Sequence, residues 1–101
     1  MPKSRYILTK KAVSDLSAIW NYSYDQWSEK QADLYYNQLL QHCNVLAEKP
    51  DSGKSYAGVM KSLRGSRLNK HIIFYRSLGT GQIEIVRILH QRMDLENRLK
   101  E

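Results

Sequence analysis

The sequence predicts an α+β fold, in which a helical hairpin packs on a small, mainly antiparallel, twisted β-sheet. Residues 10–48 repeat apolar side chains every three or four positions, the spacing of amphipathic helices. Two runs rich in β-branched and aromatic residues, 71–78 and 82–90, flank a Gly-Thr-Gly turn and predict a β-hairpin. A chain of 101 residues, 42% hydrophobic and 26% charged, suits one modest core. We therefore assign residues 1–101 to a single domain.

The first elements are a strand at 5–9 and a helix from Lys10. "RYILT" is a short apolar run that ends on Thr9, whose hydroxyl can cap the helix that follows. The three-and-four spacing then predicts the buried face of this helix, made of Val13, Leu16, Trp20, Tyr24 and Trp27.

A second helix is predicted to begin at Ser28 and to end near Glu48. Ser28 and Gln31 have the spacing of a capping box, and "KPDSG" supplies the residues that stop a helix. Its apolar face is Ala32, Tyr35, Tyr36, Leu39, Cys43 and Leu46. The lone Cys43 is expected to be a small buried hydrophobe, because one cysteine forms neither an internal disulfide nor the usual zinc site. So short a link makes the two helices antiparallel, giving the hairpin 10–48.

The strands are predicted within residues 58–90, the first of them near 60–68. Strand alternation in 82–90 places Ile83, Ile85, Arg87 and Leu89 on one face, and Glu84, Val86, Ile88 and His90 on the other. Both faces are largely apolar, so this strand is expected to be central. The helical hairpin can cover only one face. The other is closed by the tail, by a partner, or not at all.

Residues 91–101 are predicted as a basic C-terminal tail with a short amphipathic helix. Of the net charge of +6, residues 51–101 supply +5, with ten Lys and Arg against five Asp and Glu. Such a surplus favours nucleic acid or an acidic protein as partner. No apolar run is long enough to span a bilayer and the start lacks the pattern of a leader, so we expect a cytoplasmic protein with no membrane contact.

Familiar catalytic constellations are absent from the sequence, so we expect no cofactor and no metal. What remains is a set of strand arginines with His90 at the end of the last strand. His90 is either a general acid or base or a packed residue, and we favour packing. Arg87 either pairs with a buried carboxylate or projects into a partner groove, and we favour the partner. Arg64 is predicted to be an exposed contact, and Trp20, Trp27, Tyr35 and Tyr36 to be mostly core.

The chain resembles the RelE/ParE superfamily of bacterial toxins from type II toxin–antitoxin systems. The resemblance rests on "YILTKKAVSDLSAIWNYSYDQW", "QADLYYNQLL", "LAEKPDSGK", "SLRGSRLNKHIIFYR" and "IEIVRILHQRMD", in that order, and covers nearly the whole chain. "HIIFYR" followed by "ILHQRMD" is most similar to the ParE branch. The resemblance implies a non-enzymatic toxin that poisons DNA gyrase and blocks replication. It also implies a cognate ParD-like antitoxin, whose acidic, flexible C-terminal segment folds onto the toxin in a hetero-oligomer.

Candidate site residues follow from this resemblance and from the charge distribution. Antitoxin binding is expected at Arg64, Arg67, Arg76 and Arg87, and target binding at Arg92, Met93, Asp94 and Arg98. The alternative is a RelE-like toxin that cuts messenger RNA on the ribosome, with Arg64, Arg76 and His90 as catalytic residues. No tyrosine follows Tyr75, so that alternative lacks the acid that such relatives carry near the C-terminus. A third possibility is a non-toxic binding module that retains only antitoxin binding.

Overall fold

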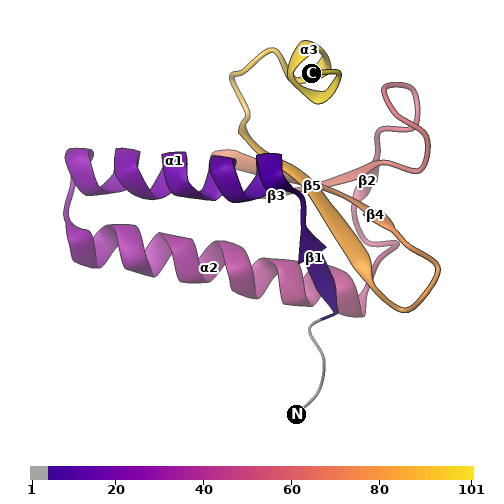
Figure 1. Cartoon of the computed structure of the whole chain (residues 1–101), viewed down its shortest axis with the longest axis horizontal. Coiled ribbons are helices and arrows are strands. Elements are labelled where there is room, and N and C mark those ends of the chain that lie inside the picture. Colours follow the sequence, from indigo (N-terminus) through magenta and orange to yellow (C-terminus); the bar gives the residue numbers. More distant parts are fainter. Residues whose placement is uncertain (1–4) are drawn as a thin grey trace.

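The computed structural model describes residues 5–101. Residues 1–4, which are part of the predicted domain and of the N-terminal stretch that lacks a leader pattern, lie outside the described residues. One sheet is flanked by a long helical hairpin on one face and a short C-terminal helix on the other (Figure 1). The elements in chain order are β1 (Tyr6–Leu8), α1 (Lys10–Gln26), α2 (Glu29–Glu48), β2 (Lys54–Ser55), β3 (Arg64–Leu68), β4 (His71–Ser77), β5 (Ile83–His90) and α3 (Leu95–Leu99).

The sheet has the order β1-β5-β4-β3-β2, which makes β5 an interior strand. Only β1 and β5 pair in parallel, so the predicted α+β class and mainly antiparallel sheet are confirmed. The turn between β4 and β5 places Gly79 and Gly81 at positive φ, where glycine is favoured. The strand predicted near 60–68 begins only at Arg64, because a turn anchored by the Tyr56 N–H and the Leu63 carbonyl precedes it. The two-residue β2 was not predicted.

Both predicted helix caps are present. The Thr9 hydroxyl accepts the Ala12 N–H at 3.0 Å, and the Ser28 hydroxyl accepts the Gln31 N–H at 3.0 Å. The predicted buried face of α2 is also correct, with Leu39, Cys43 and Leu46 inside the core.

The predicted buried face of α1 is correct only in part. Leu16 is buried as predicted and Trp20 is partly buried, whereas Val13, Tyr24 and Trp27 are exposed. Two overlapping stripes satisfy the same helical spacing, and the one that packs on the core contains Ala12, Leu16 and Ile19. The hairpin also extends well past the sheet, so side chains near its tip have no sheet to pack on (Figure 1).

A β-bulge changes the predicted faces of β5. Phe74 pairs with Arg87 and Tyr75 pairs with Ile85, so Val86 is the extra residue. Beyond the bulge the alternation is reversed: Ile88 joins Ile83 and Ile85 in the core beneath the hairpin, and Leu89 packs with Val86 on the other face.

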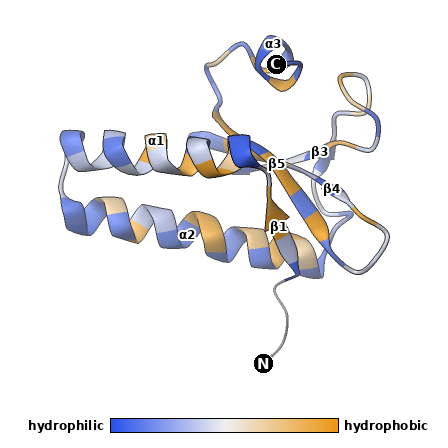
Figure 2. Ribbon diagram, in the orientation of Figure 1, coloured by the Kyte–Doolittle hydropathy of each residue, from blue (hydrophilic) through white to orange (hydrophobic). Residues whose placement is uncertain are grey.

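The second face of the sheet has its own small core, built from Leu63, Phe74, Leu89 and Leu99. Leu99 of α3 is buried against it, and Leu95 and Tyr56 pack around it. The tail, together with the loop before β3, therefore covers the face that the hairpin leaves open. Apolar colour follows β1 and β5 between these two coverings (Figure 2).

Candidate functional site

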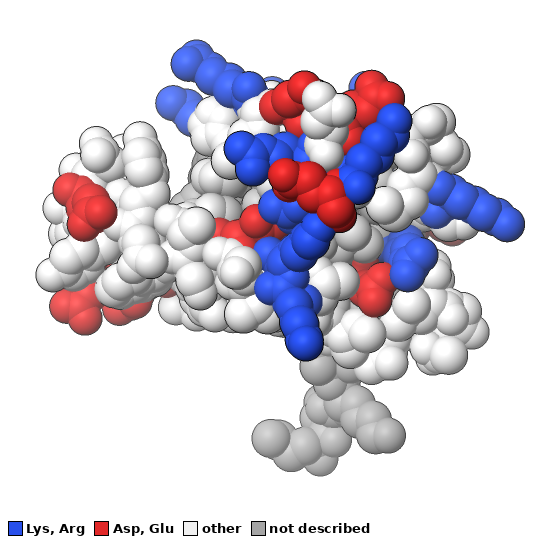
Figure 3. Space-filling view, turned by 45° about the horizontal axis from the view of Figure 1, so that its top comes forward, with Lys and Arg blue, Asp and Glu red and all other residues white. Residues whose placement is uncertain are grey.

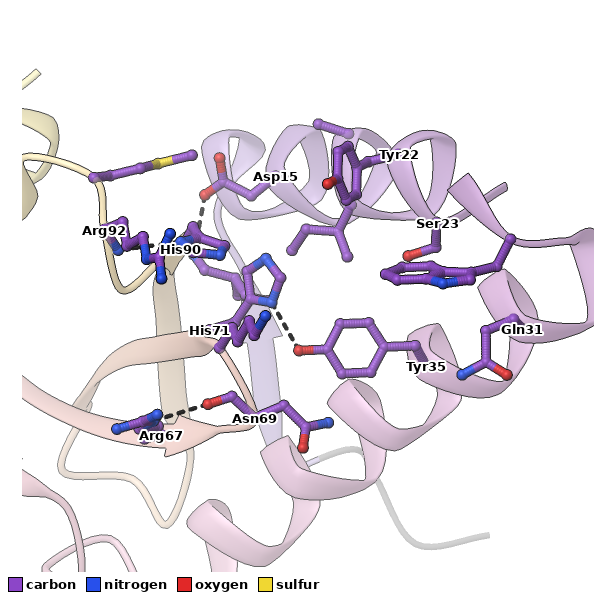
Figure 4. Close-up of a pocket in the computed structure, with 16 residues that line it drawn as sticks. Asp15, Tyr22, Ser23, Gln31, Tyr35, Arg67, Asn69, His71, His90 and Arg92 are labelled. Atoms are coloured by element: carbon purple, nitrogen blue, oxygen red, sulfur yellow. Dashed lines mark hydrogen bonds between the residues drawn. The ribbon is translucent and has the colours of Figure 1, made fainter. Parts of the chain in front are cut away.

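A groove of about 980 Å³ lies between the hairpin and the end of the sheet where β4 begins and β5 ends. We call it the hairpin groove. Its apolar wall combines Ile19 and Ile88 with three aromatic side chains, Tyr22, Trp27 and Tyr35. Side chains from both helices and from the strand ends converge on it (Figure 4).

The other end of the hairpin groove is formed by basic and imidazole side chains: Arg67, Lys70, His71, His90 and Arg92. The Tyr35 hydroxyl hydrogen-bonds His71 Nδ1 at 2.7 Å, and the His71 and His90 rings meet edge to face at 5.3 Å (Figure 4). Burial, reinforced by His90, lowers the pKa of His71 to about 4, so its ring is neutral at pH 7. His90 Nδ1 accepts the Arg92 N–H at 3.1 Å, which places the proton of a neutral His90 ring on Nε2.

Ion pairing separates the basic residues of the groove from the other arginines. Among residues 5–101, no carboxylate pairs with Arg67, Lys70 or Arg92. The remaining arginines of the second half are all in ion pairs: Arg64 with Asp51, Arg76 with Glu84, Arg87 with Asp15 and Glu101, and Arg98 with Glu101. Basic side chains gather over the sheet and α3, while the far end of the hairpin shows acidic ones (Figure 3). Three cations without a carboxylate partner among residues 5–101 thus lie together at one end of the groove.

Arg87 does not project toward a partner, and our preference for that role was wrong. Its guanidinium forms a bidentate pair with Asp15, with Nε–Oδ2 at 2.8 Å and Nη2–Oδ1 at 2.9 Å. It also donates to the Arg98 carbonyl of α3 at 3.0 Å, and Arg87 is 9% exposed. Asp15 in turn accepts the Ile88 N–H. The prediction considered only Glu84 as a carboxylate partner, because strand alternation describes neighbours within the sheet. The partner that Arg87 actually has, Asp15, lies on α1.

The predicted antitoxin set does not form one surface. Register places Arg64 on the hairpin side of β3, where its Nη1 donates to the Gly53 carbonyl at 2.8 Å, so it is anchored as well as partly exposed. Arg76 and Glu84 face each other across strands on the opposite side. Of the four predicted arginines, Arg67 alone lines the hairpin groove.

The residues proposed for an RNA-cleaving site are not brought together either. His90 pairs with His71 at the start of β4, and Arg76 lies five residues farther along that strand. At the rise of a β-strand this is roughly 17 Å. Arg64 pairs with Tyr75 and lies at the same distant end. The three side chains cannot act on one phosphate.

The four predicted target-binding residues are exposed and belong to a tail whose short helix packs on the second face of the sheet. Arg92 and Met93 line the hairpin groove, and Asp94 caps α3 by accepting from Asn97. Arg98 lies within α3. Residues 91–101 contain three basic and three acidic side chains, so the tail is charge-balanced and not basic.

Several groove residues were missed from the sequence. Lys70 occupies the turn before β4. The one signal that could have placed Lys70 in the groove is its position next to His71, which pairs with His90. Tyr22 and Trp27 are 60% and 66% exposed, although helical spacing suggested that Trp27 was core. Trp20, Tyr35 and Tyr36 are partly buried.

Within residues 5–101, no group of His, Cys, Asp and Glu side chains could hold a metal ion, and no helix has the length and apolar composition needed to cross a membrane. Cys43 is fully buried, and burial raises the pKa of its thiol to about 12, so its packing role is confirmed and its nucleophilicity is low.

Comparisons with known proteins identify similar toxins. The family model described as the ParE toxin of the type II toxin–antitoxin system parDE matches residues 6–95. Toxin ParE1 of Mycobacterium tuberculosis is 36% identical over 96 residues, covering 95% of this chain and 98% of the relative. Toxin ParE1 of Caulobacter vibrioides is 34% identical, covering 93% and 96%. A solved structure, the chromosomal ParDE TA system from P. aeruginosa, matches with a TM-score of 0.72 at 21% identity, covering 84% of this chain and 92% of that chain, which supports the fold.

Proposed function

This chain belongs to the ParE family of toxins from type II toxin–antitoxin systems, and from that premise we propose that it inhibits DNA gyrase and so blocks replication. The observation that carries the proposal is the match to ParE toxins over nearly the whole chain. The separation of Arg64 and Arg76 from His90 supports a toxin that acts by binding and not by cutting RNA.

The neutralising partner is a cognate antitoxin, whose acidic, flexible segment occupies the hairpin groove. The apolar wall of Ile19 and Ile88 suits the apolar face of an amphipathic segment. Arg67, Lys70 and Arg92 supply positive charges that no carboxylate of residues 5–101 neutralises. This reassigns the antitoxin contact from the strand arginines to the basic end of the groove.

Target contact is proposed at the exposed junction after β5, from Arg92 to Asp94, with Arg98 beside it. His90 positions this junction by accepting the Arg92 N–H. Deleting the tail would also remove Leu99 from the second core, so deletion confounds target binding with folding. Substitution of the exposed Arg92 and Met93 avoids that difficulty.

The decisive test uses purified, antitoxin-free protein in two parallel assays: gyrase supercoiling with detection of cleaved DNA, and cleavage of messenger RNA on programmed ribosomes. We expect cleaved DNA to accumulate and RNA to stay intact. Arg92→Glu combined with Met93→Ser should abolish gyrase inhibition, whereas His90→Ala should retain part of it. Cut RNA with unaffected gyrase would overturn the proposal.

Antitoxin binding can be tested by titration calorimetry at several salt concentrations. Affinity should fall with salt, because exposed charge pairs are screened. Lys70→Ala and Arg67→Ala should weaken binding more than the matched controls Arg64→Ala and Arg76→Ala. Equal losses for both pairs would place the antitoxin elsewhere.

A further inference from the structure

We propose that the hairpin groove also binds a short segment of single-stranded DNA, with bases on Tyr22 and Trp27 and phosphates on Arg67, Lys70 and Arg92. The choice of DNA rests on the proposed action on gyrase, which holds cleaved DNA. The binding chemistry rests on the groove alone.

The aromatic end of the groove is exposed far more than a packing role explains. Trp27 is 66% and Tyr22 is 60% exposed, and their rings meet edge to face at 6.2 Å. The helical rise places these residues roughly 10 to 18 Å along α1 from Asp15, which lines the other part of the groove. An exposed aromatic ring can stack on a base of any sequence, because every base has a π-face.

The basic end supplies what the phosphates of such a strand require. Arg67 and Lys70 come from the β3–β4 hairpin and Arg92 from the junction after β5. All three line one groove and have no carboxylate partner among residues 5–101. The Arg67 Nε donates to the Asn69 carbonyl at 2.8 Å, which holds this side chain over the turn before β4 (Figure 4). In its neutral form His90 carries its proton on Nε2, a further donor in the groove.

This arrangement selects a single strand over a duplex. Paired bases in B-DNA are stacked on one another and offer no free face to Tyr22 or Trp27. A groove of about 980 Å³ accepts a few nucleotides and is far too small for a double helix. Because the acidic antitoxin segment is proposed for the same groove, antitoxin and DNA should exclude each other.

The experiment measures fluorescence anisotropy of a labelled twelve-nucleotide thymidine strand against the full, antitoxin-free chain. Binding should exceed that of a duplex of the same length at least tenfold, with a log–log salt slope of about −2 for three phosphate contacts. Arg67→Ala, Lys70→Ala and Arg92→Ala should each reduce affinity and shallow the slope. Trp27→Ala should reduce affinity and leave the slope unchanged.

The matched controls are Arg64→Ala and Arg76→Ala, which remove the same charge outside the groove and should bind like the parent protein. Equal binding of duplex and single strand, or equal losses for control and groove variants, would overturn the proposal. So would RNA binding tenfold more tightly than DNA, or an acidic antitoxin peptide that binds the groove without displacing the strand. Gyrase inhibition measured on the same preparation separates the two proposals: inhibition without strand binding overturns this inference alone.

Discussion

Replacing Arg87 by alanine should lower the free energy of unfolding by about 3 kcal/mol, as expected when one partner of a buried ion pair is removed. The side chains of Arg87 and Asp15 are only 11% and 13% exposed, so the remaining Asp15 carboxylate would keep the Ile88 N–H and lose its counter-charge. The substitution also removes the donor that binds the Arg98 carbonyl, loosening α3. Arg76→Ala is the control, because its pair with Glu84 is more exposed and such pairs contribute less than about 1 kcal/mol.

Urea denaturation followed by circular dichroism measures this difference. With an m-value of about 1.5 kcal/mol/M, the midpoint should fall by about 2 M for Arg87→Ala and by less than about 0.7 M for Arg76→Ala. The Asp15→Ala, Arg87→Ala double variant should be less destabilised than the sum of the single variants, since each single change leaves a stranded partner. Equal midpoints for the two arginine variants would refute the claim that Arg87 organises this side of the fold.

Three other perturbations test separate parts of the structure. His71 has a folded-state pKa of about 4 against an ordinary 6.5, so the unfolded chain takes up the proton first as the pH falls. The free energy of unfolding should be full above pH 6.5 and fall by about 1 kcal/mol toward pH 5, allowing for partial solvent screening. The His71→Gln variant should flatten this pH dependence in urea titrations. Gly53→Ala should lower the free energy of unfolding by about 1 to 3 kcal/mol, because the added Cβ would lie 2.5 Å from the Tyr75 hydroxyl. In the control Gly58→Ala the added Cβ meets nothing within 4 Å, so the melting temperature should stay within about a degree or two of the parent value. Leu99→Ala should lower the free energy of unfolding by about 2 to 4 kcal/mol, measured by calorimetry, and should raise the rate of hydrogen exchange in α3. A loss no larger than that of Leu34→Ala, at an exposed position, would show that α3 contributes little to stability.

Local patterns were sufficient to predict most of the elements. Capping by Thr9 and Ser28 depends on side chains a few residues from their partners, and the β4–β5 hairpin depends on a glycine turn between apolar runs. Each of these signals is confined to one short stretch of chain. For the same reason, the apolar face of α2 could be read directly.

What could not be predicted depends on contacts distant in sequence. Arg87 and Asp15 are 72 positions apart, and no periodicity links them. The bulge at Val86 moves Ile88 to the hairpin side of the sheet, whereas an unbroken alternation places Ile88 on the opposite side. Whether Trp27 is core or surface depends on how far the hairpin extends past the sheet, a matter of three-dimensional length and not of spacing.

The parallel pairing of β1 with β5 has a consequence for when the chain becomes a toxin. Tyr6 pairs with Ile83, and the Thr9 hydroxyl donates to the Val86 carbonyl, 77 positions away. Closing so long a loop is slow, because the chain loses conformational entropy before any stabilising contact forms. During synthesis the hairpin can form early, but the first strand has no partner until β5 has emerged from the ribosome. The groove walls contributed by β5 and the following junction are completed at that late stage, so the hairpin groove is assembled only when nearly the whole chain has been made.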